Sequence, residues 1–178
     1  MRNTLLITTL LFGLTTAAQE ATWTSVLDIN PFIGTGGHGH THPSAQAPFG
    51  MIQLGPNTRY DGWDGCGGYH YTDSAMYGFS CTHLSGTGVS DYGDLLMLPY
   101  SSPTKEGDHI KFFKEDEHAQ AGYYACILDD STRIEATAGD RTGILRIRFG
   151  KGSEPGILVD LNFRDRVLKQ EFSALKDG

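Results

Sequence analysis

The chain has 178 residues, and 14 Lys and Arg against 21 Asp and Glu give it a formal net charge of −7 at pH 7. That length fits one domain, and 39% hydrophobic with 20% charged residues argues against a disordered chain. The acidic balance argues against a nucleic-acid partner, which requires a basic surface. Glycine is abundant, at 23 residues without a collagen period, so we expect glycines at turns and close backbone approaches.

The first 18 residues have the pattern of an export signal. Arg2 precedes an apolar run from Leu5 to Leu14, and Thr16, Ala17 and Ala18 supply the small residues of a cleavage site. This run is too short to span a bilayer, and no second run of spanning length follows. We therefore predict a signal peptide at 1–18 and an exported domain at 19–178 that is periplasmic, cell-surface or secreted. The alternative is that the run forms a buried strand or helix.

The rest of the chain divides by composition. Residues 31–93 hold 14 of the 23 glycines and five of the seven histidines, which predicts loops and short strands that shape a surface. Leu95–Leu98 is a short apolar run before Pro99, which predicts a strand buried on both faces. Four strand-like runs then follow between turn residues: Tyr123–Leu128, Arg133–Ala138, Ile144–Phe149 and Ile157–Leu161. Their spacing predicts an all-β fold, a β-sandwich.

One of these runs predicts its own orientation. Leu145, Ile147 and Phe149 alternate with Arg146 and Arg148, so a strand would bury the first three and leave the arginines in water.

The cysteines give a weaker indication. Cys66, Cys81 and Cys126 are odd in number, so at least one thiol has no partner within the chain. No CxxC pair occurs, and we expect buried thiols, with their disulfide state left open.

Two short patterns in the uncharged stretch 29–58 have competing explanations. Residues 34–39 match GxGxxG, but prolines follow where a dinucleotide site needs a helix, so we reject nucleotide binding. His38, His40 and His42 alternate, and an extended backbone would point all three to one side, where they could bind a transition metal. The alternative is a polar loop whose histidines bond neighbouring carbonyls, and no carboxylate lies within this stretch to orient the rings.

The segment from Asn57 to Tyr71 is the most informative. It combines Arg59, Trp63 and Asp64 with four glycines. Aromatic faces stack on the apolar faces of sugar rings, while carboxylates and guanidinium groups bond sugar hydroxyls. A structural turn with a core tryptophan explains the composition equally well. Carboxylates are numerous elsewhere, but no glycosidase acid/base pair can be chosen from spacing.

The order of longer motifs adds a resemblance to a known family. NPFIGTGGHGHTHPSAQAPFGMIQLGPNTR, then DGWDGCGGYHY, then GFSCTHLSGTGVSDYGDLLMLP, resembles the opening of glycoside hydrolase family 92, whose members are largely exo-acting α-mannosidases, many specific for α-1,2 links. FKEDEHAQAGYYACILDD and RTGILRIRF also resemble family blocks. The resemblance covers about residues 26–168.

The resemblance implies an N-terminal β-sandwich of the galactose-mutarotase-like supersandwich type, packed on an (α/α)₆ toroid. It also implies calcium dependence and inversion, with the acid, the base and most calcium ligands in the toroid. That toroid is absent from these 178 residues, so the resemblance implies a truncated sandwich, inactive alone, whose partners are the missing catalytic domain and a mannose-containing glycan. No catalytic residue and no metal ligand is assigned in this chain.

What carries over is a share of the substrate pocket. Trp63 would be a stacking platform, Arg59 and Asp64 hydroxyl or loop anchors, and Cys66 and His83 further pocket residues. The family block commonly has Trp and Ser flanking the cysteine, where this chain has Gly65 and Gly67, and His42 stands where an aromatic is common. Linkage preference or affinity could therefore differ. A stand-alone carbohydrate-binding module and a structural domain with a histidine metal site are the competing hypotheses.

Overall fold

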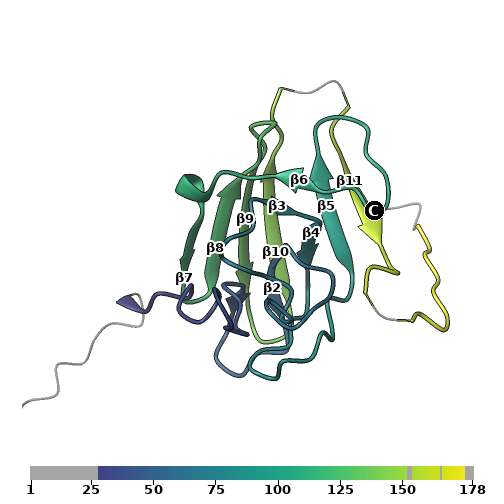
Figure 1. Cartoon of the computed structure of the whole chain (residues 1–178). Coiled ribbons are helices and arrows are strands. Elements are labelled where there is room, and N and C mark those ends of the chain that lie inside the picture. The colour runs from purple at the N-terminus through teal and green to yellow at the C-terminus, as the bar shows by residue number, and fades with distance from the viewer. Residues whose placement is uncertain (1–27, 152–153, 165, 175–178) are drawn as a thin grey trace, which may run out of the picture.

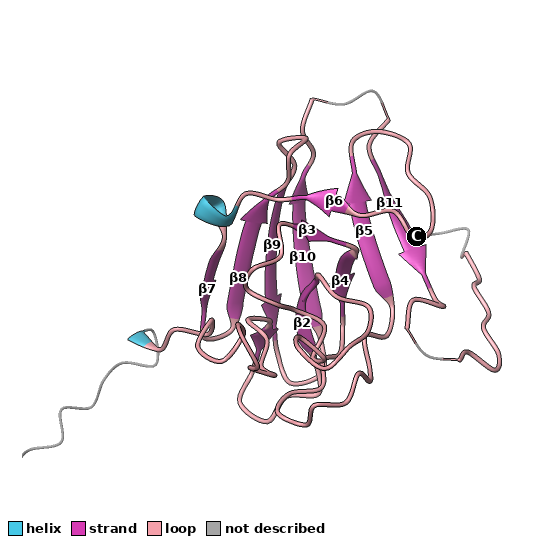
Figure 2. Cartoon of the chain, in the orientation of Figure 1, coloured by secondary structure: helices cyan, strands magenta, loops and turns pink. Residues whose placement is uncertain are grey.

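Two antiparallel sheets build the fold that the computed structural model gives for residues 28–151, 154–164 and 166–174 (Figures 1 and 2). The five-stranded sheet has the order β1 (Ala45–Gln46), β2 (Gln53–Asn57), β4 (Gly78–Ser80), β5 (Leu96–Tyr100), β11 (Gly156–Asp160). The four-stranded sheet has the order β10 (Gly143–Arg148), β9 (Arg133–Ala138), β8 (Tyr123–Ile127), β7 (His118–Gln120). β3 (Ala75–Met76) and β6 (Ile110–Lys111) form a separate pair. The predicted signal peptide lies outside the described residues.

The core lies between the two sheets. Leu54 of β2 and Phe79 of β4 face Tyr124 of β8 and Ile134 of β9, and all four side chains are buried. The rings of Phe79 and Tyr124 meet edge to face at 5.8 Å. Facing sheets with an apolar interior are the β-sandwich that the strand spacing predicts, and this prediction is confirmed.

The helical content is confined to short turns. The described ranges contain a 3₁₀ turn, η2 (Lys114–Asp116), and no α-helix. Among these residues, none forms a helix long and apolar enough to cross a membrane.

Two strand predictions need correction at their ends. The strand around Leu98 begins at Leu96 and continues through Pro99, whereas Leu95 precedes it and is 42% exposed. Pro99 is tolerated because β4 pairs with β5 only at Met97, so no ladder bond to β4 is lost there. Phe149 was expected to be buried, but β10 ends before it and is the outermost strand of its sheet. Leu145 and Ile147 are only half-buried where the alternation predicts burial, because β10 is an edge strand, while Arg146 and Arg148 are exposed as predicted.

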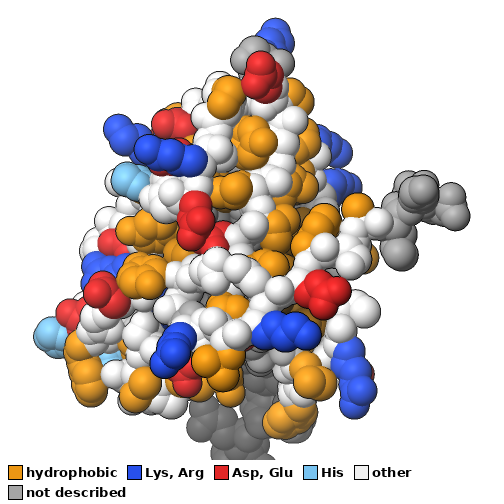
Figure 3. All heavy atoms as spheres, turned by 90° about the vertical axis from the view of Figure 1, so that its right-hand side faces the viewer, with side chains coloured by type: hydrophobic (Ala, Val, Ile, Leu, Met, Phe, Trp, Pro, Cys, Tyr) orange, Lys and Arg blue, Asp and Glu red, His pale blue; other side chains and the backbone are white. Residues whose placement is uncertain are grey.

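One end of the sandwich interior is uncovered. Phe79 pairs with Met97, which pairs with Val159, so these side chains share the face that packs on the second sheet. Burial falls along this row from Phe79, which is inaccessible, to Val159, which is 45% exposed on the outermost strand. Figure 3 shows this side of the molecule, where hydrophobic side chains form an upright band.

Candidate functional site

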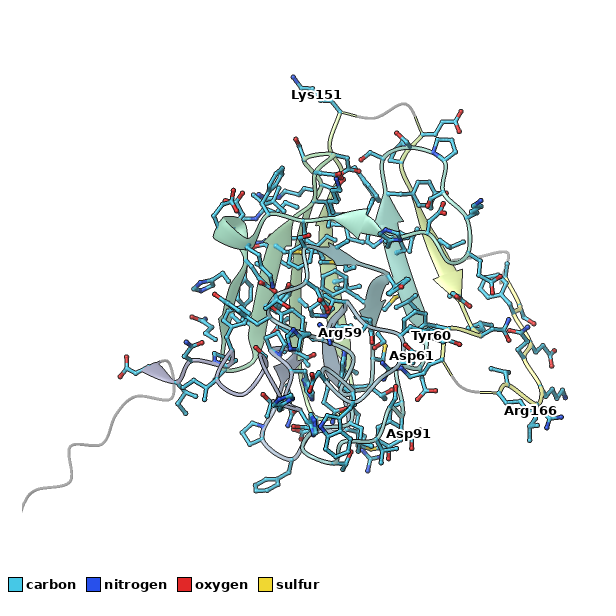
Figure 4. The ribbon with its side chains drawn as sticks, in the orientation of Figure 1. Arg59, Tyr60, Asp61, Asp91, Lys151 and Arg166 are labelled. Atoms are coloured by element: carbon cyan, nitrogen blue, oxygen red, sulfur yellow. The ribbon has the colours of Figure 1, made fainter. Side chains whose placement is uncertain are left out.

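Three loops meet at one end of the sandwich: residues 34–42, 58–71 and 82–94. The amide of Gly86 donates to the carbonyl of His40 at 2.7 Å, and the amide of Tyr71 donates to the carbonyl of Thr35 at 2.9 Å. In Figure 4, Asp91 lies near the bottom of the view, at the opposite end from Lys151, and Arg59 lies between these two heights. These bonds make the three glycine-rich segments one surface.

The middle loop is closed at its base by its own backbone. The amides of Thr58 and Arg59 both donate to the carbonyl of Gly68, at 2.7 and 3.1 Å. Gly68 has φ +102°, and a Cβ at this position would collide with the side chain of Asn57. Glycine is required there for both reasons.

Arg59 anchors this loop from within. Its Nε and Nη2 donate to the two oxygens of Asp73 at 3.0 and 3.2 Å, and its Nη1 donates to the carbonyl of Asp64 at 2.9 Å. The guanidinium is therefore engaged by the protein on both sides. Of the two roles expected for Arg59, the geometry favours the loop anchor.

Of the predicted site residues, Trp63 is the most exposed, and the side chains of Asp64 and Arg59 are 34% and 31% exposed. Trp63 is 63% exposed, and its ring meets the ring of His40 at 4.8 Å and 83°. An Asp64 carboxylate oxygen lies 2.9 Å from Nδ1 of His38, and this hydrogen bond holds the pKa of Asp64 below its usual range. Consecutive residues of this loop thus present an exposed aromatic ring and a partly exposed carboxylate, two kinds of group that suit a sugar.

Cys66 and His83 lie beneath that surface. Cys66 is inaccessible to solvent, and His83 is 4% exposed. The ring nitrogens of His83 lie 2.9 Å from the carbonyl of Gln53 and 3.2 Å from that of Pro56. Burial lowers the pKa of His83 to about 4, against the opposing effect of these two carbonyls. The placement of Cys66 and His83 favours support of the loops over contact with a ligand.

The three alternating histidines make separate contacts instead of converging. His38 meets Asp64, a carboxylate that the stretch 29–58 does not itself contain, and His40 meets Trp63. His42 stacks on His83 at 4.8 Å, and burial followed by repulsion from His83 lowers the pKa of His42 to about 3. Within the described ranges, no three His, Cys, Asp or Glu side chains gather to hold a metal ion.

Arg164 is a site residue that the sequence did not reveal. Its Nη1 donates to the carbonyls of Cys66 and Asp91, both at 3.2 Å, and its Nη2 donates to the carbonyl of Arg59 at 2.9 Å. One guanidinium from the segment after β11 therefore joins two of the three loops. These contacts cannot be predicted from local sequence patterns, because they join residues that lie 73 to 105 positions apart.

The cysteines are all free thiols. Cys66 and Cys126 are buried as predicted, whereas Cys81 is half-buried. Burial raises the pKa of Cys81 and of Cys126, so neither thiol is activated as a nucleophile.

A separate groove of about 640 Å³ lies between β1 and the turn joining β7 to β8. Its lining includes Ala47, Pro48, Gln120 and Ala138 and carries no titratable side chain. It supplies no acidic or basic side chain, in contrast to the loop surface.

Comparison with known proteins decides the family. The model of the glycosyl hydrolase family 92 N-terminal domain matches residues 28–177. The chain belongs to this family. It is 30% identical to an uncharacterized secreted glycosidase from Arthroderma benhamiae, over 75% of this chain and 19% of that protein.

Solved structures agree with the family. The family GH92 alpha-mannosidase BT3965 from Bacteroides thetaiotaomicron is similar with a TM-score of 0.74 and 37% identity, over 78% of this chain and 20% of that one. The inverting mannosidase BT2199 from the same organism gives 0.68 and 27%, over 76% and 19%. The chain thus spans about one fifth of the length of these relatives, and its fold is that of the family's N-terminal β-sandwich.

Proposed function

We propose that this family 92 domain is the N-terminal part of an exported α-mannosidase that hydrolyses terminal α-mannosides, with α-1,2 links as the first choice, and that it forms one wall of the sugar pocket. The observation that carries the proposal is the exposed indole of Trp63 beside the ionised Asp64, on a fold like that of BT3965. An aromatic plane accepts the apolar face of a hexose, and the carboxylate accepts hydrogen bonds from its hydroxyls.

The hydrolytic step itself requires groups beyond this wall. An inverting glycosidase needs one carboxylic acid to protonate the leaving oxygen and one carboxylate to activate a water on the opposite face. We assign both to the larger part of the enzyme, which its relatives have in addition to this domain. The contribution of this chain is to bind and orient the sugar through Trp63 and Asp64, on loops held by Arg59.

Calcium dependence is part of the same proposal, with its ligands mainly outside this domain. In the described part of the chain, no three His, Cys, Asp or Glu side chains gather at one place, and this absence of a carboxylate cluster supports placing the calcium ligands in the rest of the enzyme. Calcium, when bound in the whole enzyme, would supply charge for holding sugar hydroxyls.

The test has two parts, both on residues 19–178. We expect no release of mannose from α-1,2-mannobiose, and release would refute the assignment of the acid and base to the rest of the enzyme. We also expect measurable binding of methyl α-mannoside that Trp63→Ala abolishes, and glucoside binding of equal strength would refute the mannoside assignment.

The exposure of Trp63 also favours a second candidate, a carbohydrate-binding module without catalysis. Fusion of residues 19–178 to the C-terminal four fifths of BT3965 separates the two. Mannosidase activity above that of the isolated C-terminal part supports the enzyme domain, and tight glycan binding without any such gain supports the module.

A further inference from the structure

Trp63 is exposed but closely confined. Its indole is 63% exposed, yet the ring of His40 stands nearly perpendicular to it at 4.8 Å. A Cβ built on Gly88 would lie only 2.7 Å from both Cζ3 and Cη2 of the indole. The six-membered ring therefore lies against a bare Cα on one side and a histidine ring on another.

The two neighbours of Trp63 are fixed to each other. The same Cβ on Gly88 would lie 3.1 Å from Cε1 of His40, so the three residues pack as one unit drawn from three loops. The amide of Gly86 donates to the carbonyl of His40 at 2.7 Å and ties the loop of Gly88 to that of His40. Gly88 also has φ +72°, a conformation that glycine adopts without strain.

The ring of His40 contacts Trp63 by packing and not through a hydrogen bond of its Nε2. Its Nε2 is buried and has no hydrogen-bond partner among the described residues. The contact with Trp63 is an edge-to-face ring contact, which any flat aromatic ring of similar size can make.

We propose that Gly88 and His40 are positioning residues that hold the Trp63 indole in one orientation, so that its open face is ready to stack on the apolar face of a pyranose. The sugar part of this inference rests on the proposed function. An exposed tryptophan that rotates freely loses side-chain freedom when it binds, and confinement beforehand removes that loss. Substitution of either neighbour should therefore weaken sugar binding without touching the sugar.

Gly86 provides a matched control for Gly88. Both glycines lie in the same loop with left-handed backbones, φ +82° and +72°, but a Cβ on Gly86 meets nothing within 4 Å. Gly86→Ala and Gly88→Ala therefore carry the same backbone strain, and only Gly88→Ala displaces Trp63. Both are made in a Trp23→Phe background, which leaves Trp63 as the single tryptophan.

The first readout is the orientation of the indole. We expect the near-ultraviolet circular dichroism of Trp63 and its slow fluorescence anisotropy to fall in Gly88→Ala and to stay unchanged in Gly86→Ala. His40→Ala should reproduce the loss, and His40→Phe should restore the signal because it keeps the ring edge. Equal dichroism and anisotropy in Gly86→Ala and Gly88→Ala, together with no loss of either signal in His40→Ala, would overturn the inference.

The second readout is affinity for methyl α-mannoside at a temperature where every variant is folded. We expect about tenfold weaker binding in Gly88→Ala and His40→Ala, which corresponds to about 1.4 kcal/mol, and unchanged binding in Gly86→Ala and His40→Phe. A changed dichroism with unchanged affinity would overturn the positioning role. Absence of binding by the unaltered chain would overturn the sugar part of the inference but leave the proposed function standing, because one wall of a pocket can need the rest of the enzyme to bind, while the dichroism still decides whether Trp63 is held. Should Gly88→Ala fail to fold, the His40 pair gives the same decision.

Discussion

Glu117 is a buried carboxylate that connects the site loops to the second sheet, and Glu117→Ala should destabilise the domain strongly. Its side chain is 2% exposed. Tyr69, in the 58–71 loop, donates to its Oε1 at 2.8 Å, and Tyr124 of β8 donates to the same oxygen at 2.7 Å. Lys114 donates to Oε2 at 2.8 Å. Burial raises the pKa of both tyrosines, so their hydroxyls remain donors across the working pH range.

The magnitude follows from the groups that lose their acceptor. The variant leaves the two tyrosine hydroxyls without the carboxylate and leaves the ammonium of Lys114, whose side chain is 27% exposed, without its counter-charge. Removal of one partner of a buried ion pair costs about 3–5 kcal/mol. Because Lys114 retains some water, we expect about 3–4 kcal/mol. At about 2–4 °C per kcal/mol for a domain of this size, the melting temperature should fall by roughly 6–16 °C.

Urea unfolding of residues 19–178, followed by circular dichroism, measures this loss. The matched control is Glu115→Ala, which removes the same charge from an exposed side chain of η2 and should leave the urea midpoint unchanged. Lys114→Met should cost less than Glu117→Ala, because the carboxylate keeps its two tyrosine donors. A loss below about 1 kcal/mol for Glu117→Ala would refute the reasoning that this carboxylate is a buried structural acceptor.

Four further predictions concern pH and backbone. The pKa of His42 is about 3 in the folded chain against 6.5 in the unfolded chain, so the free energy of unfolding should fall as pH drops from 6.5 toward 3. In urea titrations at several pH values, His42→Phe should reduce this fall, and an unchanged pH dependence would refute the prediction. The pKa of Glu135 is lowered to about 2 from 4.5, so its stabilisation is present above pH 4.5 and lost as pH falls through about 2; Glu135→Gln should remove this dependence of the melting temperature, and a retained one contradicts it. Phe49 is fully exposed at φ +60°, so Phe49→Asn should raise the melting temperature by a few degrees, and a decrease would show that the ring makes a needed contact. Arg164→Met should speed amide hydrogen exchange in residues 58–68, with unchanged exchange in β8 as the control. Equal protection of residues 58–68 in Arg164→Met and in the unaltered chain would refute the role of Arg164 as a loop anchor.

The strands could be predicted from the sequence because their signal is local. Alternation within Ile144–Phe149 and the turn residues between the later runs depend only on neighbours in the chain. The failures occur where a neighbouring strand decides the outcome. Phe149 follows the outermost strand of its sheet, and Pro99 continues a strand because β4 no longer pairs there. Neither fact is visible within a window of ten residues.

The candidate site likewise has features that local sequence predicts and features that residues far away in the chain decide. Composition located the glycine-rich block, and in the structure Trp63 of this block is exposed and Asp64 is partly exposed. Arg164 and Glu117 were missed because each acts through partners far away in the chain, and no periodicity marks such a contact. The sequence therefore indicated this surface as a candidate site without indicating what holds it in shape.

Gly86 and Gly88 show why the position of the loop surface can be predicted from the sequence but the contacts that hold it cannot. In the sequence they are equivalent members of one SGTG motif, and in the structure they have nearly the same left-handed backbone. Only the packing distinguishes them, since a side chain on Gly86 would enter open space and one on Gly88 would enter the indole of Trp63. Backbone freedom is a local property and can be read from residue type. Close approach depends on which loop arrives from elsewhere in the chain, so the part played by a glycine at this site follows from Trp63 and His40 and not from the motif around it.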